Sequence, residues 1–395
     1  MTTAPLAAAP QAAPDPHAAV AEVAAVAERH SRRTDAEAAF PVEVLGELRR
    51  TGLLGLLVPG RFGGMGGGLR EMIEAAEQLG RVDMSVAMIF AMHCQQVAAI
   101  TEHAGEDLAA QVLPRIAAGQ LYLGSITTEL ATGGHLLTSE AKLGAEDGRL
   151  QLDRFAPIVT GGAYADAFLI TMQSPFARGS HEVSLVLAEA AELDLQVSGN
   201  WNPLGMRASH SVALKLRGSV AADRVIGGHG GFRQVATQTF GPMAHLGWSA
   251  CWLGTAAGAL SRVLSLIREP ANRSKYPTDS PLLLRRLSEA RCRLDTVHAL
   301  LQHTRSVVEE SLDRSSPRIQ LLLNALKIQA SEQCLGVVDS LMDIVGMRHA
   351  YLADSPTRLE FALRDLRSAP LNYSNDRLHE VDGKFTLLDQ AVRFV

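Results

Sequence analysis

The sequence predicts an α+β protein with an N-terminal helical domain, a central antiparallel β-barrel or sandwich and a C-terminal four-helix bundle. Three patterns predict this order. The first part has apolar residues at helical spacing, the middle has short β-branched runs between turn residues, and the last part has long apolar stripes. We therefore expect a disordered tail over 1–16 and domains over 17–120, 121–231 and 232–395.

The N-terminal section begins with a tail rich in Ala, Pro and Thr, without the basic and apolar blocks of a signal peptide. An Ala-rich helix is expected over 17–33, and Pro41 opens a second helix at a position that tolerates proline. Residues 84–103 are apolar on all sides, which predicts a buried helix that begins after the capping residue Asp83. A glycine loop at 60–68 fits neither the dinucleotide-binding pattern nor the P-loop.

The middle section contains two runs, 125–135 and 155–166, that are rich in hydroxyls, glycines and β-branched residues. A turn at 146–148 lies between them. Hydroxyls and free backbone N–H groups beside glycine suit the edge of a planar heterocycle better than a metal ion. Two ordinary strands joined by a turn have the same composition, and composition alone favours this simpler interpretation.

The C-terminal section contains two stripes of apolar residues three and four apart, Leu246 to Ile267 and Ile319 to Val345. Both stripes predict long helices packed in a bundle. A loop over 269–281 separates the first from a third helix between them, and the final helices break near 370–373.

Composition argues against several classes of function. The net charge is −5 and no basic stripe points to nucleic acid. The four cysteines lack metal-ligand spacing and resemble reduced core residues of a cytoplasmic protein. No apolar run approaches the length that spans a membrane. Neither HExxH nor GxSxG is present, so we expect no metal hydrolase or serine hydrolase.

Six short segments, in this order, resemble the acyl-CoA dehydrogenase family. They are Val58-Pro59 with Phe62-Gly63-Gly64, Thr128-Glu129 with Gly133-Gly134, Ile158-Val159-Thr160 with Ala165-Asp166, Leu204–Ser209 with Ser211, Arg273 with Tyr276, and Arg364-Asp365. The resemblance covers nearly the whole chain and identifies it as a divergent member. It implies an FAD between the β domain and the bundle, an acyl-CoA or acyl-carrier-protein substrate on the other side of the ring, and a homodimer or homotetramer.

Matching the segments residue by residue implies which side chains contact the cofactor. The flavin ring would contact Thr127, Thr128, Ile158 and Thr160, with Gly134 in the same segment as the first two. Arg273 and Tyr276 would lie on the pyrophosphate and adenine side, and Gly346 stands where the family has a glycine pair near the adenine. An arginine fork suits a pyrophosphate, and hydroxyls near the ring tune where its electrons settle.

The catalytic base is where the chain departs from the family. The resemblance implies a glutamate just after the Arg-Asp segment, where this chain has Ser374, or on the first bundle helix, where it has Ala244-His245. The other candidates for catalysis are Asp376, His379, His93 and His245. Simpler roles are that Asp376 caps the last helix and that His93 is a hydrogen-bonded core histidine.

Three functions follow from these residues. The first is an FAD-dependent α,β-dehydrogenation of an acyl thioester with a relocated base, which passes electrons to a transfer partner. The second is a monooxygenase that receives reduced flavin from a reductase and uses O₂, where no glutamate is needed and His93 could supply a proton. The third is a non-redox or partner-binding member, which would be recognised by a thermal melt that added FAD leaves unchanged.

Overall fold

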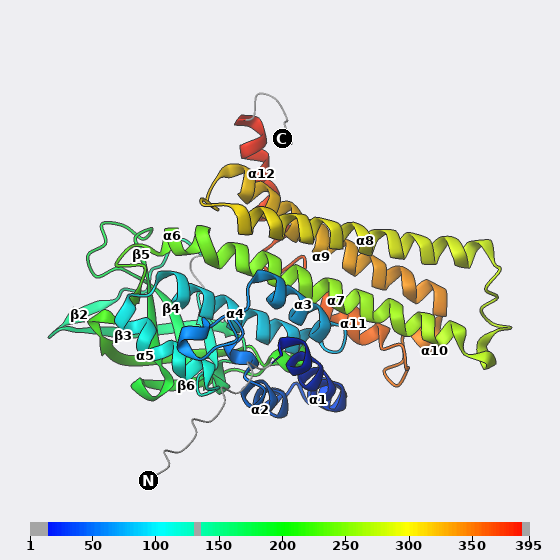
Figure 1. The fold of residues 1–395 in the computed structure, drawn as a ribbon, viewed down its shortest axis with the longest axis horizontal. Coiled ribbons are helices and arrows are strands. Elements are labelled where there is room, and N and C mark those ends of the chain that lie inside the picture. Colours follow the sequence, from blue (N-terminus) through cyan, green and yellow to red (C-terminus); the bar gives the residue numbers. More distant parts are fainter. Residues whose placement is uncertain (1–14, 130–135, 389–395) are drawn as a thin grey trace, which may run out of the picture.

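A computed structural model describes residues 15–129 and 136–388 and divides them into helices, sheets and helices in chain order (Figure 1). The N-terminal helices are α1 (Pro16–Glu37), α2 (Val42–Arg50), α3 (Leu69–Gly80), α4 (Met84–His103) and α5 (Glu106–Ala117). Helix α4 is buried along most of its length, as its sequence predicts, and packs against α3 and α7. The Asp83 carboxylate accepts hydrogen bonds from the amides of Ser85 and Val86, so it caps this helix as expected.

The β section consists of two four-stranded sheets with strand orders β1-β4-β5-β8 and β2-β3-β7-β6. The strands are β1 (Leu123–Ile126), β2 (Gly144–Glu146), β3 (Arg149–Val159), β4 (Ala167–Gln173), β5 (Val183–Glu189), β6 (Leu193–Ser198), β7 (Val212–Ala221) and β8 (Val225–Ile226). The prediction of a wholly antiparallel domain is wrong for one pair of strands, because β1 pairs with β4 in parallel. The chain leaves β1, passes through β2 and β3 of the other sheet, and returns to β4 in the original direction.

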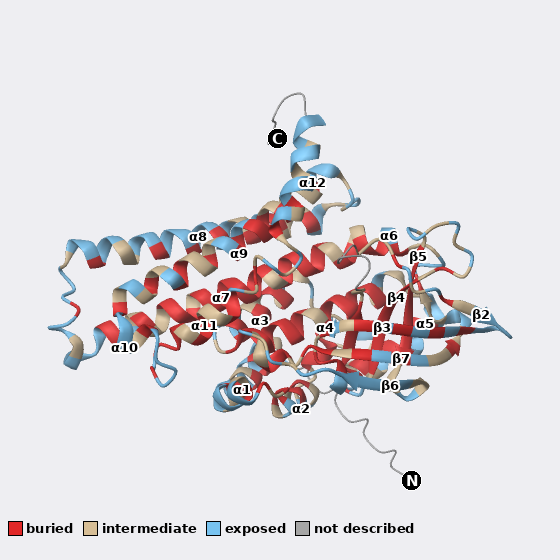
Figure 2. Ribbon diagram, turned by 180° about the vertical axis from the view of Figure 1, so that it is seen from behind, coloured by how far each residue is buried: buried red, intermediate tan, exposed pale blue. Residues whose placement is uncertain are grey.

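Three long helices form the C-terminal section: α7 (Gly241–Arg268), α8 (Pro281–Glu310) and α9 (Pro317–Val345). The short α6 (Phe232–Val235) and a π-helical turn, Ala236–Phe240, precede α7, and α10 (Met347–Ala350) follows α9. Helix α11 (Leu359–Leu366) packs on α7 and α9, whereas α12 (Asn375–Leu388) contacts α9 and projects from the body (Figure 2). The predicted fourth bundle helix is thus short, because the turn at 367–374 separates α11 from α12.

The expectation that no segment has membrane-spanning character is wrong by length and composition alone. Helix α4 and the stretch Phe232–Arg268 are both long and apolar enough to cross a membrane. Most of each lies inside the protein, however, where core helices of soluble proteins have the same composition. Their burial makes them weak evidence for membrane insertion.

Two of the short sequence segments meet where the β section joins the helices. The Arg364 guanidinium donates to both carboxylate oxygens of Asp35 in α1, at 3.0 and 2.6 Å. The next residue, Asp365, accepts the amide of Met206 at 2.6 Å. A Cβ on the adjacent Gly205 would lie 2.0 Å from the Arg364 carbonyl oxygen, so only glycine allows this approach. The Leu204–Ser209 and Arg364-Asp365 segments therefore form a structural joint.

Candidate functional site

The two hydroxyl-rich runs of the β section lie side by side. The Thr128 hydroxyl donates to the Ile158 carbonyl oxygen at 3.2 Å, and the Thr160 hydroxyl lies 3.1 Å from that of Ser211. A β-bulge between Ala156 and Val159 interrupts the alternation of β3, and Ile158 is 53% exposed. An exposed apolar side chain beside ordered hydroxyls fits the face and edge of a flavin ring. Thr127 is half-buried next to Thr128.

A buried ion pair between Glu129 and Arg154 fixes the segment around Thr128, just after β1. The Arg154 guanidinium in β3 donates to Glu129 at 2.8 Å and to the Thr128 carbonyl oxygen at 3.2 Å, and also bonds the Thr171 carbonyl oxygen. Burial favours a raised pKa for Glu129, but the Glu140 amide, the Ser139 hydroxyl and the Arg154 charge outweigh it and lower that pKa. The pair thus ties Thr128 to the middle of the sheet.

His93 has no free ring nitrogen. Its Nδ1 accepts the Leu123 amide at 3.1 Å and its Nε2 lies 2.9 Å from the Leu54 carbonyl oxygen, which requires the proton on Nε2. Burial lowers the pKa of His93 to about 4, so the ring is neutral at physiological pH. The ring joins α4 to β1 and to the turn at 53–55. Of the two sequence interpretations, the hydrogen-bonded core histidine describes this geometry.

A second polar region lies inside the bundle between α7 and α9. Three buried groups on one face of α7 have no hydrogen-bond partner among the described residues: His245 Nδ1, Ser249 Oγ and Trp252 Nε1. Their spacing of four and three residues places them in a row. Lys327 of α9 faces this row, with its ammonium 5.7 Å from the centroid of the Trp252 ring.

The turn before α12 closes this region. The Tyr373 ring lies 6.4 Å from the His245 ring, so the two places where the resemblance implies a glutamate are neighbours in space. Ser374 is half-buried, whereas Asp376 and His379 are exposed. Ser374, not Asp376, immediately precedes α12, and its carbonyl oxygen accepts the Leu378 amide at 3.3 Å.

The charges of this region are unusual for a protein core. Burial lowers the pKa of Lys327 to about 8, and burial together with the Lys327 charge lowers that of His245 to about 4. Burial also raises the pKa of Tyr373, which keeps its phenol protonated. Sequence reasoning missed Lys327, Ser249 and Trp252. A lysine within the apolar stripe of α9 is the one signal that could have pointed to them.

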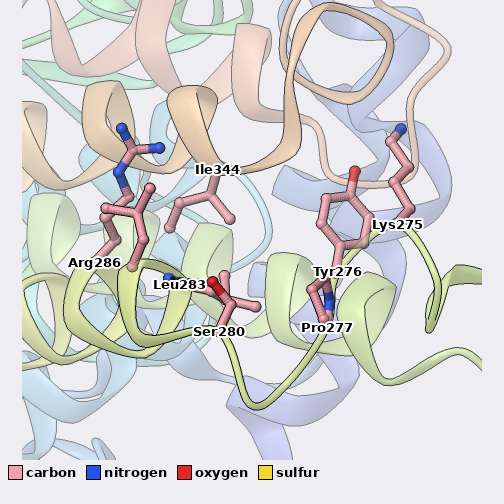
Figure 3. Close-up of a pocket in the computed structure, with 8 residues that line it drawn as sticks. Lys275, Tyr276, Pro277, Ser280, Leu283, Arg286 and Ile344 are labelled. Atoms are coloured by element: carbon pink, nitrogen blue, oxygen red, sulfur yellow. Dashed lines mark hydrogen bonds between the residues drawn. The ribbon is translucent and has the colours of Figure 1, made fainter.

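The remaining cofactor candidates lie at the other end of the molecule. Arg273 is exposed in the α7–α8 connection, and the buried Tyr276 donates its hydroxyl to the Val345 carbonyl oxygen at 2.9 Å, next to Gly346. Figure 3 shows Tyr276 on the wall of a cavity of about 150 Å³ that Lys275 and Arg286 also line. The β sheets lie at the opposite end of the bundle (Figure 1). One chain therefore does not bring these residues to Thr128, and Gly134 lies outside the described residues.

Two family models match the helical sections of the chain. Residues 17–120 match the acyl-CoA dehydrogenase N-terminal domain, and residues 229–371 match the acyl-CoA dehydrogenase C-terminal domain. The chain belongs to the acyl-CoA dehydrogenase family. This confirms the resemblance inferred from short segments, and the order of helices, sheets and helices is the fold of this family.

The relatives of this family member include proteins named for two different chemistries. A dibenzothiophene monooxygenase of Mycolicibacterium goodii is 23% identical over 76% of this chain and 77% of its own. The probable acyl-CoA dehydrogenase fadE25 of Mycobacterium leprae is 21% identical over 91% of this chain and 92% of its own.

The solved structures of similar fold include both kinds of protein as well. FMN-bound TdsC of Paenibacillus sp. A11-2 is 22% identical, with a TM-score of 0.83 over 94% of this chain and 98% of that one. The butyryl-CoA dehydrogenase of Megasphaera elsdenii is 17% identical, with a TM-score of 0.84 over the same shares. This member is thus a flavoprotein of the superfamily, in the class of flavin-dependent oxidoreductases.

Proposed function

We propose that this protein is a flavin-dependent monooxygenase that receives reduced flavin from a separate reductase and oxygenates a neutral aromatic heterocycle. In this reaction one oxygen atom of O₂ enters the substrate and the other leaves as water. The reduced flavin would supply the two electrons and help activate O₂. The relatives that act on dibenzothiophene support this choice of substrate class.

The observation that carries the proposal is the cluster of His245, Lys327 and Tyr373 next to α12. Dehydrogenation requires a base for the α proton, and loss of such a base costs about 10²–10⁴-fold in rate. With a pKa of about 4, His245 is a weak base, and among the described residues no carboxylate hydrogen-bonds to it or to Lys327. Oxygenation of an aromatic ring needs no base at this position.

The residues of the β section would hold the flavin. Thr127, Thr128 and Thr160 would contact the polar edge of the ring and Ile158 its face, since the hydroxyls and the exposed isoleucine fit such a group. Tyr373, protonated at physiological pH, would donate a hydrogen bond to the substrate from the bundle side. The cofactor is FAD by the resemblance, or FMN as in TdsC.

One observation favours a second candidate, α,β-dehydrogenation of an acyl thioester on CoA or a carrier protein. The pKa of Lys327 is lowered to about 8, so a fraction of its amine is uncharged at physiological pH and could accept a proton. Lys327 would then be the relocated base. An electron-transfer partner would replace the reductase. If the cofactor is FAD, a homodimer or homotetramer would bring Arg273 of a second copy to its adenine end.

Two assays on the same purified protein separate these candidates. In the first, reduced FMN or FAD, dibenzothiophene or indole, and ¹⁸O₂ are mixed, and mass spectrometry looks for the heavy isotope in the product. Labelled product supports the monooxygenase. In the second, oxidised flavin is mixed anaerobically with a panel of acyl-CoA and acyl-carrier thioesters. Bleaching of the flavin by a thioester, without labelled product in the first assay, would refute oxygenation and support dehydrogenation. A melt insensitive to both flavins would point to a non-redox member.

A further inference from the structure

We propose that Lys327 is a positioning residue that holds the turn before α12 and thereby places Tyr373 beside His245. This inference rests on the proposed function in that the pair would form the substrate side of the flavin site. In the proposed oxygenation Lys327 does not itself touch the substrate. It acts through the backbone of the turn.

The hydrogen bonds of Lys327 show what it holds. Its ammonium donates to the Tyr373 carbonyl oxygen at 3.1 Å and to Asn375 Oδ1 at 2.6 Å. The side chain is fully buried, and among the described residues it forms no ion pair with a carboxylate. Burying an ammonium is costly unless its protons are satisfied. Here neutral oxygens of the turn and the Trp252 ring stabilise the ammonium. The buried charge therefore needs the turn, and the turn is held by the hydrogen bonds that the charge donates.

The turn needs such an anchor. Tyr373 has a φ of 52°, in the left-handed region that a bulky side chain rarely adopts. Asn375 continues the anchor, since its amide group donates to Ser331 Oγ and Glu332 Oε1 of α9, both at 3.0 Å. Without Lys327 the strained residue would relax toward an ordinary backbone conformation.

The position of Tyr373 decides what the substrate meets. The residue is 36% exposed and is therefore accessible, while its ring lies 6.4 Å from that of His245. His245 has an unpartnered Nδ1 and is neutral at physiological pH. A protonated phenol beside a neutral imidazole offers one donor and one adaptable polar atom. Such a pair suits an uncharged heterocycle, and it exists only while the turn is held.

The test compares Lys327→Met with wild-type protein and with a matched surface variant, Lys384→Met on α12. Hydrogen exchange reports the turn directly through the Asn372 and Asn375 amides, which bond the Ser368 and Pro370 carbonyl oxygens. We expect Lys327→Met to accelerate exchange of these amides at least tenfold, and Lys384→Met to leave it unchanged. Exchange in the turn that stays at the wild-type rate in Lys327→Met would overturn the proposal. This readout needs neither flavin nor substrate.

A kinetic measurement tests the second half of the proposal. With indole or dibenzothiophene as the probe, Lys327→Met should raise KM at least tenfold, while flavin affinity, set by the β section, stays within twofold. Asn375→Leu removes the hydrogen bond to Lys327 from the other side. It should likewise accelerate exchange in the turn and raise KM, and it replaces Lys327→Met as the test if that variant does not fold. A loosened turn with an unchanged KM would show that the turn does not shape the substrate side.

If wild-type protein oxygenates no probe, the proposed function fails, yet the exchange experiment still decides whether Lys327 holds the turn. The two failures are therefore distinguishable. Loss of flavin affinity in Lys327→Met to the same extent as loss of turn protection would also contradict the proposal, because it would indicate general unfolding rather than release of one segment.

Discussion

Removal of one charge from the Glu129–Arg154 pair should both destabilise the protein and weaken flavin binding. The Arg154 side chain is 1% exposed and that of Glu129 is 9% exposed, and the two groups lie 2.8 Å apart. In Glu129→Gln the guanidinium keeps its burial but loses its counter-charge. Breaking a buried pair in this way costs about 3–5 kcal/mol.

The size of the effect follows from the length of the chain. For 395 residues, an unfolding entropy of about 2.1 cal/mol/K per residue converts this loss into a fall in Tm of roughly 4–6 °C. Arg154 also anchors the Thr128 carbonyl oxygen. One charge-assisted hydrogen bond contributes about 1.5 kcal/mol, so a loosened Thr128 should weaken flavin binding roughly tenfold.

Calorimetry and flavin fluorescence titration measure these two quantities. The control is Asp153→Asn, which removes the exposed ion pair between Asp153 of β3, the strand that also carries Arg154, and Arg217 of β7. Those side chains are 59% and 61% exposed at 2.8 Å, so the loss should stay below about 1 kcal/mol. Equal Tm values for Glu129→Gln and Asp153→Asn would refute the reasoning, as would unchanged flavin affinity.

The pH dependence supplies an independent check on the same pair. The folded protein lowers the pKa of Glu129, so the unfolded state binds its proton first as the pH falls. The contribution of the pair is therefore complete at neutral pH and is lost as the pH falls through the lowered pKa. The stability difference between wild type and Glu129→Gln should narrow in acid. A difference that is constant from neutral to acidic pH would contradict this.

Three further changes test other parts of the structure. His93→Gln should make the free energy of unfolding less sensitive to acid. Because the folded state lowers the pKa of His93 to about 4, the wild type loses stability as the pH falls from about 6.5 toward 4. Urea unfolding across that pH range measures the difference. Asp365→Asn should stabilise the protein most at alkaline pH. Burial raises the pKa of Asp365, so the wild type loses stability as the pH rises through that raised pKa. Calorimetry that gives the same dependence of Tm on pH for both proteins would contradict this. Gly205→Ala should cost several kcal/mol through the contact with the Arg364 carbonyl oxygen, and a normal Tm would disprove that close approach.

The sequence alone determined the order of the elements and the family. Apolar stripes predicted α7 and α9 because each helix buries one continuous face against its neighbours, and Asp83 predicted the start of α4 because a cap acts within one turn. The hydroxyl runs near Thr128 and Ile158 were also predicted to form one site, and their hydrogen bond shows that they meet. The helix predictions use residues that are close in the sequence, whereas the meeting of the two hydroxyl runs was implied by the family resemblance.

The tertiary structure decided what depends on distant residues. Only the fold shows that β1 pairs in parallel with β4 and that the α7–α8 connection, which carries Arg273, lies at the opposite end of the bundle from the β sheets. Only the fold shows that Lys327 donates a hydrogen bond to Tyr373, 46 residues away. Periodicity describes which face of an element is buried, but not which polar atom of another element it meets. A buried lysine in an apolar stripe becomes interpretable only when its hydrogen-bond acceptors are known, because they determine whether its charge is tolerated.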